Sequence, residues 1–351
     1  MDFIQTFGII CLNTQYEMDY YPNDQAISGK SMKTYRLSSL FGLTLFTLAF
    51  ALPTFAQPDP TAPKQKVRTV TIPISIFTKK ELEQDKAQEY VQADRLIVKE
   101  DKEEQTILSI RSVSDTPLTI AFLIQDDLGS SFNLQLKSIA EFIRNLPTGS
   151  RVMIAYVRAG SLDVRQKFTE DLKRVAGSLR IVTSSSAAAP RSPYEGISDA
   201  LNRFDALPAG RRAIVLFSDG LDTSQGVTTL ASGDSIDLDR AILKAQRKSV
   251  AVYSIYSPAT FTENDSSNLA LIAQNGLVKV TDETGGRAFF QGMLAPLSFD
   301  PFFKDLSILL NRQFALTYLS THMRKGYHKV DVFSTNPEVK IEHPKGYYYR
   351  Q

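Results

Sequence analysis

The sequence predicts an α/β protein with a doubly wound, mostly parallel sheet, joined to a small β-sandwich formed by its N-terminal and C-terminal strands. Strand-like and helix-like segments alternate from residue 117 to residue 312, which is typical of a sheet covered by helices on both faces. Several of these strands are continuous apolar runs, as expected of buried parallel strands. The segments on either side are rich in β-branched residues and have little helical periodicity.

Composition is that of an ordinary globular protein. The chain has 351 residues, 43% of them hydrophobic and 22% charged, with a formal net charge of +2. This length allows one large domain and a smaller module. No long stripe of lysine and arginine interleaves with aromatic residues, so we expect no nucleic-acid partner.

An export signal is predicted over residues 32–56. Lys33 and Arg36 supply a positive start, Leu37 to Leu52 is apolar, and small residues precede a cleavage point after Ala56. Cleavage would place the protein in the periplasm, on the cell surface or in the medium. A retained signal anchor is the alternative, and only that alternative gives contact with a membrane.

The residues around this signal carry little functional information. Because an export signal begins at the N-terminus, we predict that translation starts at Met32 and that residues 1–31 are an extension upstream of the true start. The only cysteine, Cys11, lies in that extension, so the mature protein would have no disulfide and no thiolate metal site. Residues 57–66 form a proline-rich linker.

The N-terminal β region is expected over residues 67–112. Val67 to Phe77 indicates a strand, and Pro73 places it near a sheet edge. A charged helix or loop is expected over 79–92. Two further strands, 95–98 and 106–111, flank a charged segment and predict a hairpin.

The α/β domain is expected over residues 117–312, and its elements follow in order. The predicted strands and helices are a buried strand at 118–124, a helix at 136–146 ending at Pro147, a hairpin of strands 152–157 and 162–168, helices at 170–179 and 194–204, a strand at 213–217, a helix around 238–245, a strand at 250–256, a helix from about 269 to the glycine pair 285–286, a short strand at 287–290 and a helix at 301–310. Right-handed crossovers would close these into a doubly wound sheet.

The C-terminal β region is expected over residues 313–351. Strands are predicted at 314–319, 328–333 and 339–341, with a turn at Asn336-Pro337. We expect them to pair with the N-terminal β region, so that the α/β domain is inserted into one β-sandwich.

Several segments together resemble the von Willebrand factor A domain. Pro117 to Ile124 is similar to its first strand, Arg211 to Thr223 to its fourth strand and following loop, and Val250 to Tyr256 to its fifth. Asp282 to Phe290, with the C-terminal Lys345 to Tyr348, is similar to a subfamily of exported A-domain proteins found widely in Acidobacteria. The resemblance spans roughly residues 67–350.

The resemblance implies a metal-ion-dependent adhesion site in the loops that follow the carboxyl ends of the strands, called the top loops below. In such sites an Asp-x-Ser-x-Ser loop, a threonine and a later aspartate hold Mg²⁺ or Mn²⁺ through oxygen atoms. Here the site is degenerate, because Leu128 stands at one serine position and residues 191–197 contain no threonine. The remaining candidate ligands are Asp126, Asp127, Ser130, Ser192 and Asp219.

Asp126 and Asp127 could instead have a structural role. Asp126 and Asp127 precede a predicted helix, where carboxylates are favoured by free N–H groups and by the helix dipole. On that reading they cap the helix and bind no ion, while Asp222 is a turn residue beside Gly220.

The sequence predicts no enzyme and no small-molecule substrate. It has no G-x-S-x-G, Walker or G-x-G-x-x-G motif. His322, His328 and His343 all lie in the C-terminal β region, where surface or packing roles are expected. The predicted function is an exported protein-interaction or adhesion-type module that binds a protein partner at the top loops. The alternative is a metal-independent structural or assembly component of a bacterial envelope complex.

Overall fold

The computed structural model describes residues 66–78, 96–112, 116–184, 191–207, 210–226, 235–264 and 267–349. The predicted extension, signal peptide and most of the linker lie outside these residues, as does the charged segment 79–92. Within the described ranges, no helix combines the length and apolar character needed to cross a membrane.

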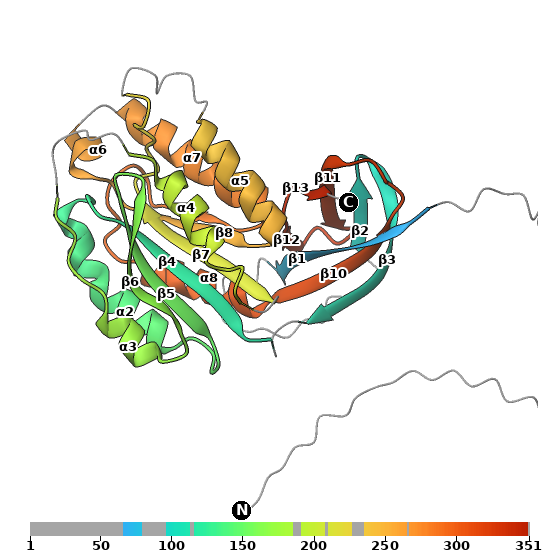
Figure 1. Cartoon of the computed structure of the whole chain (residues 1–351), viewed down its shortest axis with the longest axis horizontal. Coiled ribbons are helices and arrows are strands. Elements are labelled where there is room, and N and C mark those ends of the chain that lie inside the picture. The colour runs from blue at the N-terminus through green and yellow to red at the C-terminus, as the bar shows by residue number, and fades with distance from the viewer. Residues whose placement is uncertain are drawn as a thin grey trace, which may run out of the picture. The chain divides into compact units, whose positions relative to one another are not determined.

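The central sheet has six strands in the order β6-β5-β4-β7-β8-β9 (Figure 1). The pairs that involve β4, β7, β8 and β9 are parallel, whereas β6 is antiparallel to β5. The strands are β4 (Leu118–Gln125), β5 (Arg151–Arg158), β6 (Ser161–Thr169), β7 (Arg211–Ser218), β8 (Ala251–Tyr256) and β9 (Ala288–Phe289). The predicted mostly parallel sheet is therefore present.

Helices cover both faces of this sheet. Successive side chains of β4 point to opposite faces, so alternate residues pack against different helices. Phe122 and Ile124 belong to a core with α2 (Leu136–Arg144) and α8 (Asp300–Asn311). Ala121 and Leu123 belong to a second core with α4 (Pro193–Asn202), α5 (Ile236–Lys248) and α7 (Ser267–Thr284). Every residue of β4 is buried, which explains the continuous apolar run in the sequence.

Shorter helices and caps complete the domain. They are η2 (Ser130–Gln135), α3 (Leu172–Gly177) and α6 (Thr260–Asn264). The Ser235 hydroxyl accepts a hydrogen bond from the Leu238 N–H and so caps the start of α5. Gly285 follows α7 with a φ of 82°, a left-handed conformation that favours glycine. The predicted end of this helix at the glycine pair is confirmed.

The terminal β regions form one antiparallel sheet of seven strands, in the order β12-β1-β10-β3-β2-β11-β13. Its strands are β1 (Arg68–Thr78), β2 (Leu96–Glu100), β3 (Glu103–Ser112), β10 (Gln313–Ser320), β11 (Gly326–Ser334), β12 (Val339–Glu342) and β13 (Gly346–Tyr349). N-terminal and C-terminal strands pair directly, as expected: β10 lies between β1 and β3, and β11 pairs with β2.

The expected β-sandwich is not confirmed. A sandwich needs two packed sheets, whereas here the hydrogen-bonded ladder runs through all seven strands. The sheet curls instead around its own apolar core, which includes Ile72, Val98, Leu316 and Val330 (Figure 1). The sequence did not predict β13.

Candidate functional site

The top loops meet at the carboxyl ends of β4 and β7, which are adjacent and parallel. The side chain of Gln125, the last residue of β4, connects them. Its Oε1 accepts hydrogen bonds from the Ser218 hydroxyl at 2.5 Å and from the Asp219 N–H at 3.2 Å. Its Nε2 donates to Asp127 Oδ1 at 2.9 Å. The glutamine therefore fixes Asp127 and Asp219 at one edge of the sheet.

A buried arginine lies between these two carboxylates. Arg191 Nη2 is 2.6 Å from Asp219 Oδ2, and its Nη1 is 3.3 Å from Asp127 Oδ2. Only 5% of the Arg191 side chain is exposed, and that of Asp219 is fully buried. Asp219 also accepts hydrogen bonds from the Thr262 hydroxyl at 2.6 Å and from the Leu221 N–H at 3.1 Å.

The charges of this group influence one another. Burial raises the pKa of Asp127, and the nearby Arg191 opposes that rise. Burial disfavours the charge of Arg191, but Asp219 and Asp127 outweigh this effect and raise the pKa of its guanidinium. Because arginine stays protonated in proteins, Arg191 is a permanent cation between the two aspartates.

Asp126 belongs to a separate ion pair. Its Oδ1 lies 2.6 Å from Arg180 Nη1, and its Oδ2 lies 3.7 Å from Arg158 Nε. The Arg180 guanidinium also stacks over the Tyr156 ring, 4.0 Å from its centroid. Asp126 is thus neutralised by a second arginine.

The two predicted serine ligands make no hydrogen bond to Asp127 or Asp219 within the described residues. Ser130 is exposed at the start of η2. Ser192 donates a hydrogen bond to Asp222 Oδ2 at 3.1 Å. Asp222 Oδ1 accepts bonds from the Ser224 N–H and hydroxyl, so Asp222 is a turn residue, as expected, that also holds Ser192.

The alternative role of Asp126 and Asp127 as helix caps is wrong. The helix that follows, η2, begins after Gly129 and has no side-chain cap. The N-cap position of α2 is Gln135, which also makes no capping hydrogen bond. Both aspartates bind arginines instead, because these charged partners reach them from other loops.

The residues present do not fit a divalent ion. Such an ion would need the carboxylate oxygens of Asp127 and Asp219 that the Arg191 guanidinium now contacts. Leu128, at a position where the family has a serine, is fully buried and apolar. Of the five candidates, Asp127 and Asp219 share the Arg191 guanidinium. This arrangement does not support the predicted binding of Mg²⁺ or Mn²⁺.

Exposed apolar side chains lie in η2 and in two segments that are hydrogen-bonded to it. Leu134, Ile181 and Leu297, which we call the apolar rim, are 80%, 65% and 93% exposed. Side-chain hydrogen bonds join their segments. The Asn133 amide bonds the backbone N–H and carbonyl of Val182, and the Gln135 amide bonds the Leu297 carbonyl and the Phe299 N–H.

Sequence reasoning missed Arg180, Arg191 and Thr262. One signal for Arg191 was available, since it directly precedes Ser192 in the loop where the family's threonine is absent. A cation at that position can replace the charge of an ion. Arg180 and Thr262 lie 54 and 43 residues from their aspartate partners, and no local pattern marks them.

No protein-family model matches the chain, and no curated protein matches it in sequence. Several solved structures are similar in fold. BatB from Bacteroides thetaiotaomicron is 14% identical with a TM-score of 0.38, covering 54% of this chain and 95% of that one. An aerotolerance-related membrane protein from Bacteroides fragilis is 12% identical with a TM-score of 0.37, covering 55% and 98%. A von Willebrand factor type A protein from Catenulispora acidiphila is 11% identical with a TM-score of 0.38, covering 74% of each chain. Likenesses of this size carry no argument about function.

Proposed function

We propose that the chain is an exported, non-enzymatic protein-interaction module that docks an apolar surface of a partner protein on its top loops. The observation that carries this proposal is the apolar rim. Large apolar side chains gathered at one edge and left in water are typical of a protein-binding surface. Leu294, three residues before Leu297, is also 75% exposed.

The rim is a suitable docking surface because its backbone is held in place. Asn133 and Gln135 fix η2 to the segments of Ile181 and Leu297 through four hydrogen bonds. A partner that covers the rim gains the hydrophobic free energy of burial, about 25 cal/mol per Å² of apolar surface. It loses little conformational entropy in ordering these segments.

We infer that docking needs no Mg²⁺ or Mn²⁺. In an adhesion site of the usual kind, the ion keeps one coordination position open for an acidic group of the partner. Here Arg191 supplies the positive charge between Asp127 and Asp219, and it is almost fully buried. Recognition then depends on apolar contact at the rim.

The proposal that the protein is exported depends on the predicted signal sequence at residues 32–56. It needs a separate test. N-terminal sequencing of the protein recovered from its host should find Gln57 as the first residue. A chain that begins at Met1 or Met32 would contradict cleavage. The second of these would still agree with a retained anchor.

Photo-cross-linking tests the docking surface. A benzoylphenylalanine residue is placed at position 134 or 297, and in a control at position 108. Leu108 is 49% exposed on β3 of the terminal sheet, so the control probe is also accessible. We expect one protein adduct from both rim positions and none from position 108.

The same cross-linking experiment distinguishes docking at the rim from the alternative function, a structural or assembly component of an envelope complex. An adduct from position 108 alone would favour an assembly component that uses the terminal sheet. Absence of any specific adduct from the rim in the native host would contradict the proposal.

A further inference from the structure

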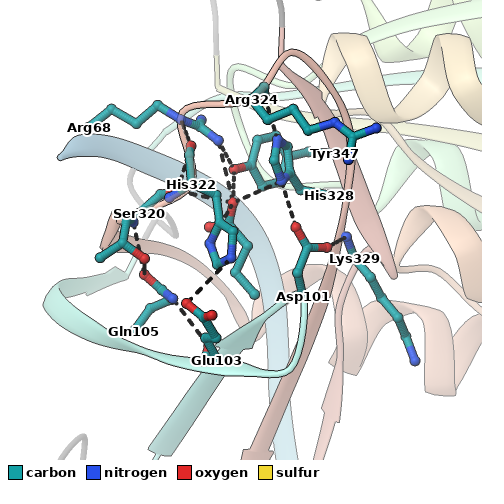
Figure 2. Close-up of polar contacts among 12 residues, drawn as sticks. Arg68, Asp101, Glu103, Gln105, Ser320, His322, Arg324, His328, Lys329 and Tyr347 are labelled. Carbon is teal, nitrogen blue, oxygen red and sulfur yellow. Dashed lines mark hydrogen bonds and ion pairs between the residues drawn. The ribbon is translucent and has the colours of Figure 1, made fainter. Parts of the chain in front are cut away.

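A second polar cluster lies in the terminal sheet (Figure 2). Its members are Glu100 at the end of β2, Asp101 in the turn that follows, and His322 and His328 from the C-terminal region. The turn is tight, since Asp101 and Lys102 have φ values of 49° and 77°. Pairing of β2 with β11 sets Glu100 opposite Val330, which brings His328 close to this turn.

The two imidazoles direct the same ring atom at the Glu100 carboxylate. His328 Nδ1 lies 3.4 Å from Glu100 Oε1 and 2.8 Å from Asp101 Oδ2, while His322 Nδ1 lies 3.8 Å from Glu100 Oε1. Ligand atoms around a tetrahedral ion with bonds of about 2.0 Å are about 3.3 Å apart. The two His328 separations lie on both sides of that value, whereas His322 Nδ1 is farther from Glu100 Oε1 and would have to move closer to share the ion.

The other ring nitrogens face oxygen acceptors. His328 Nε2 lies 2.7 Å from the Arg324 carbonyl oxygen, and His322 Nε2 lies 3.5 Å from Glu103 Oε2. A proton held on each Nε2 leaves the Nδ1 lone pairs free. Metal-binding histidines usually have this arrangement, in which an outer oxygen fixes the tautomer and the ring orientation.

Two buried atoms of the cluster have no hydrogen-bond partner in the described residues. They are Glu100 Oε2 and His322 Nδ1. The Glu100 side chain is fully buried, and its Oε1 is held by Ser320 and Tyr347 hydroxyls at 3.0 and 2.6 Å and by Arg68 Nη2 at 3.4 Å. Buried polar atoms without partners are rare in proteins, and an ion is one explanation. Because Oε1 already accepts from Ser320, Tyr347 and Arg68, Oε2 is the Glu100 oxygen that is free to bind it.

We propose that Glu100, Asp101 and His328, whose ligand atoms lie within 4.8 Å of one another, bind one divalent transition-metal ion of the Zn²⁺ type, and that the His322 ring moves in as the fourth ligand. Two imidazole nitrogens and two carboxylate oxygens suit Zn²⁺ better than Mg²⁺, which prefers oxygen ligands alone. Four protein ligands make a closed, structural site. The ion would join the N-terminal hairpin to the C-terminal strands, a role independent of docking at the apolar rim.

Titration of Zn²⁺ into chelator-stripped full-length protein, followed by calorimetry and by the absorption of bound Co²⁺, tests the site. We expect one ion per chain and the visible bands of tetrahedral Co²⁺. His328→Gln and His322→Gln should each weaken binding by more than about 100-fold, beyond the effect of changing an outer-shell group.

His343→Gln is the matched control. His343 is also a buried histidine of this sheet, but its ring nitrogens bond the Val332 N–H and the Pro344 carbonyl, so its removal should leave affinity unchanged. Asp219→Asn should also keep the ion, which separates this site from the top loops. Circular dichroism checks that each variant folds.

Two results would overturn the proposal. One is folded wild-type protein that takes up no Zn²⁺ in stoichiometric excess. That result would leave a metal-free hydrogen bond between His328 and Asp101. The other is binding that neither histidine substitution in the cluster weakens. If both histidine variants fail to fold, the Co²⁺ spectrum of the wild-type protein still distinguishes a tetrahedral metal site from a metal-free cluster.

Discussion

Replacing Arg191 with leucine removes the cation between two buried carboxylates while keeping much of the side-chain volume. Asp219 would retain its hydrogen bonds from Thr262 and the Leu221 N–H but lose its only ion pair in the described residues. Asp127 would retain Gln125. Because burial already raises the pKa of Asp127, loss of the guanidinium should raise that pKa further.

The size of this effect follows from the burial of the pair. Breaking a buried ion pair by removing one partner costs about 3–5 kcal/mol, since the remaining charge stays out of water. At about 2–4 °C per kcal/mol for a protein of this size, the melting temperature should fall by about 6–20 °C. Arg212→Leu, at a partly exposed position near the start of β7, is a control for loss of one positive charge.

Thermal and urea unfolding measure the loss, with and without millimolar Mg²⁺ or Mn²⁺. The wild-type protein should not respond to either ion, because the Arg191 guanidinium already occupies the carboxylate oxygens that an ion would need. Arg191→Leu should gain stability when the ion is added, since ligand binding to the folded state stabilises by RT ln(1 + [L]/Kd). A wild-type melting temperature that rises with Mg²⁺, and does not rise in Asp219→Asn, would refute this reasoning.

Four further outcomes are expected. Phe217→Ala should destabilise by about 3–5 kcal/mol in urea unfolding, because its fully buried ring packs among other phenylalanines; a loss below about 1 kcal/mol would show that the core is loosely packed. Gly286→Ala should also destabilise, since a Cβ there would lie 1.9 Å from the Val252 carbonyl oxygen, and an unchanged melting temperature would contradict that close approach. Burial lowers the pKa of His343 below 6.5, against its hydrogen bond to a carbonyl. The unfolded state therefore binds more protons, so the free energy of unfolding should decrease as pH falls below 6.5, and His343→Gln should flatten this slope; an equal slope in both proteins would exclude His343 as the cause. Leu297→Ser should change the free energy of unfolding by less than about 0.5 kcal/mol, yet it should reduce cross-linking from the probe at position 134. Unaltered cross-linking would show that the partner contacts another surface.

The sequence predicted the α/β domain well because its signals are local. The apolar run from Leu118 and the glycine pair at 285–286 each depend on a few neighbouring residues, and both are where the structure has them. The single curled sheet could not be predicted in the same way. Its ladder joins β1 to β10 across most of the chain, and strand composition does not say whether such strands form one sheet or two.

Prediction of the sites was limited because their residues come together from distant parts of the chain. Asp127 and Asp219 could be expected at one edge, because each follows a buried parallel strand. Their cation could not, since Arg191 acts through partners 28 residues and more away. Asp101 and His328 are 227 residues apart, and only the pairing of β2 with β11 makes them neighbours.

The affinity of the cross-linked partner, measured by calorimetry in chelator and again in Mg²⁺, tests the central claim most directly. Ion-independent docking at the apolar rim predicts the same dissociation constant in both buffers and at least about a tenfold weaker one for Leu297→Ser, equivalent to about 1.4 kcal/mol. Binding that disappears in chelator, returns with Mg²⁺ and is unaffected by Leu297→Ser would contradict the account.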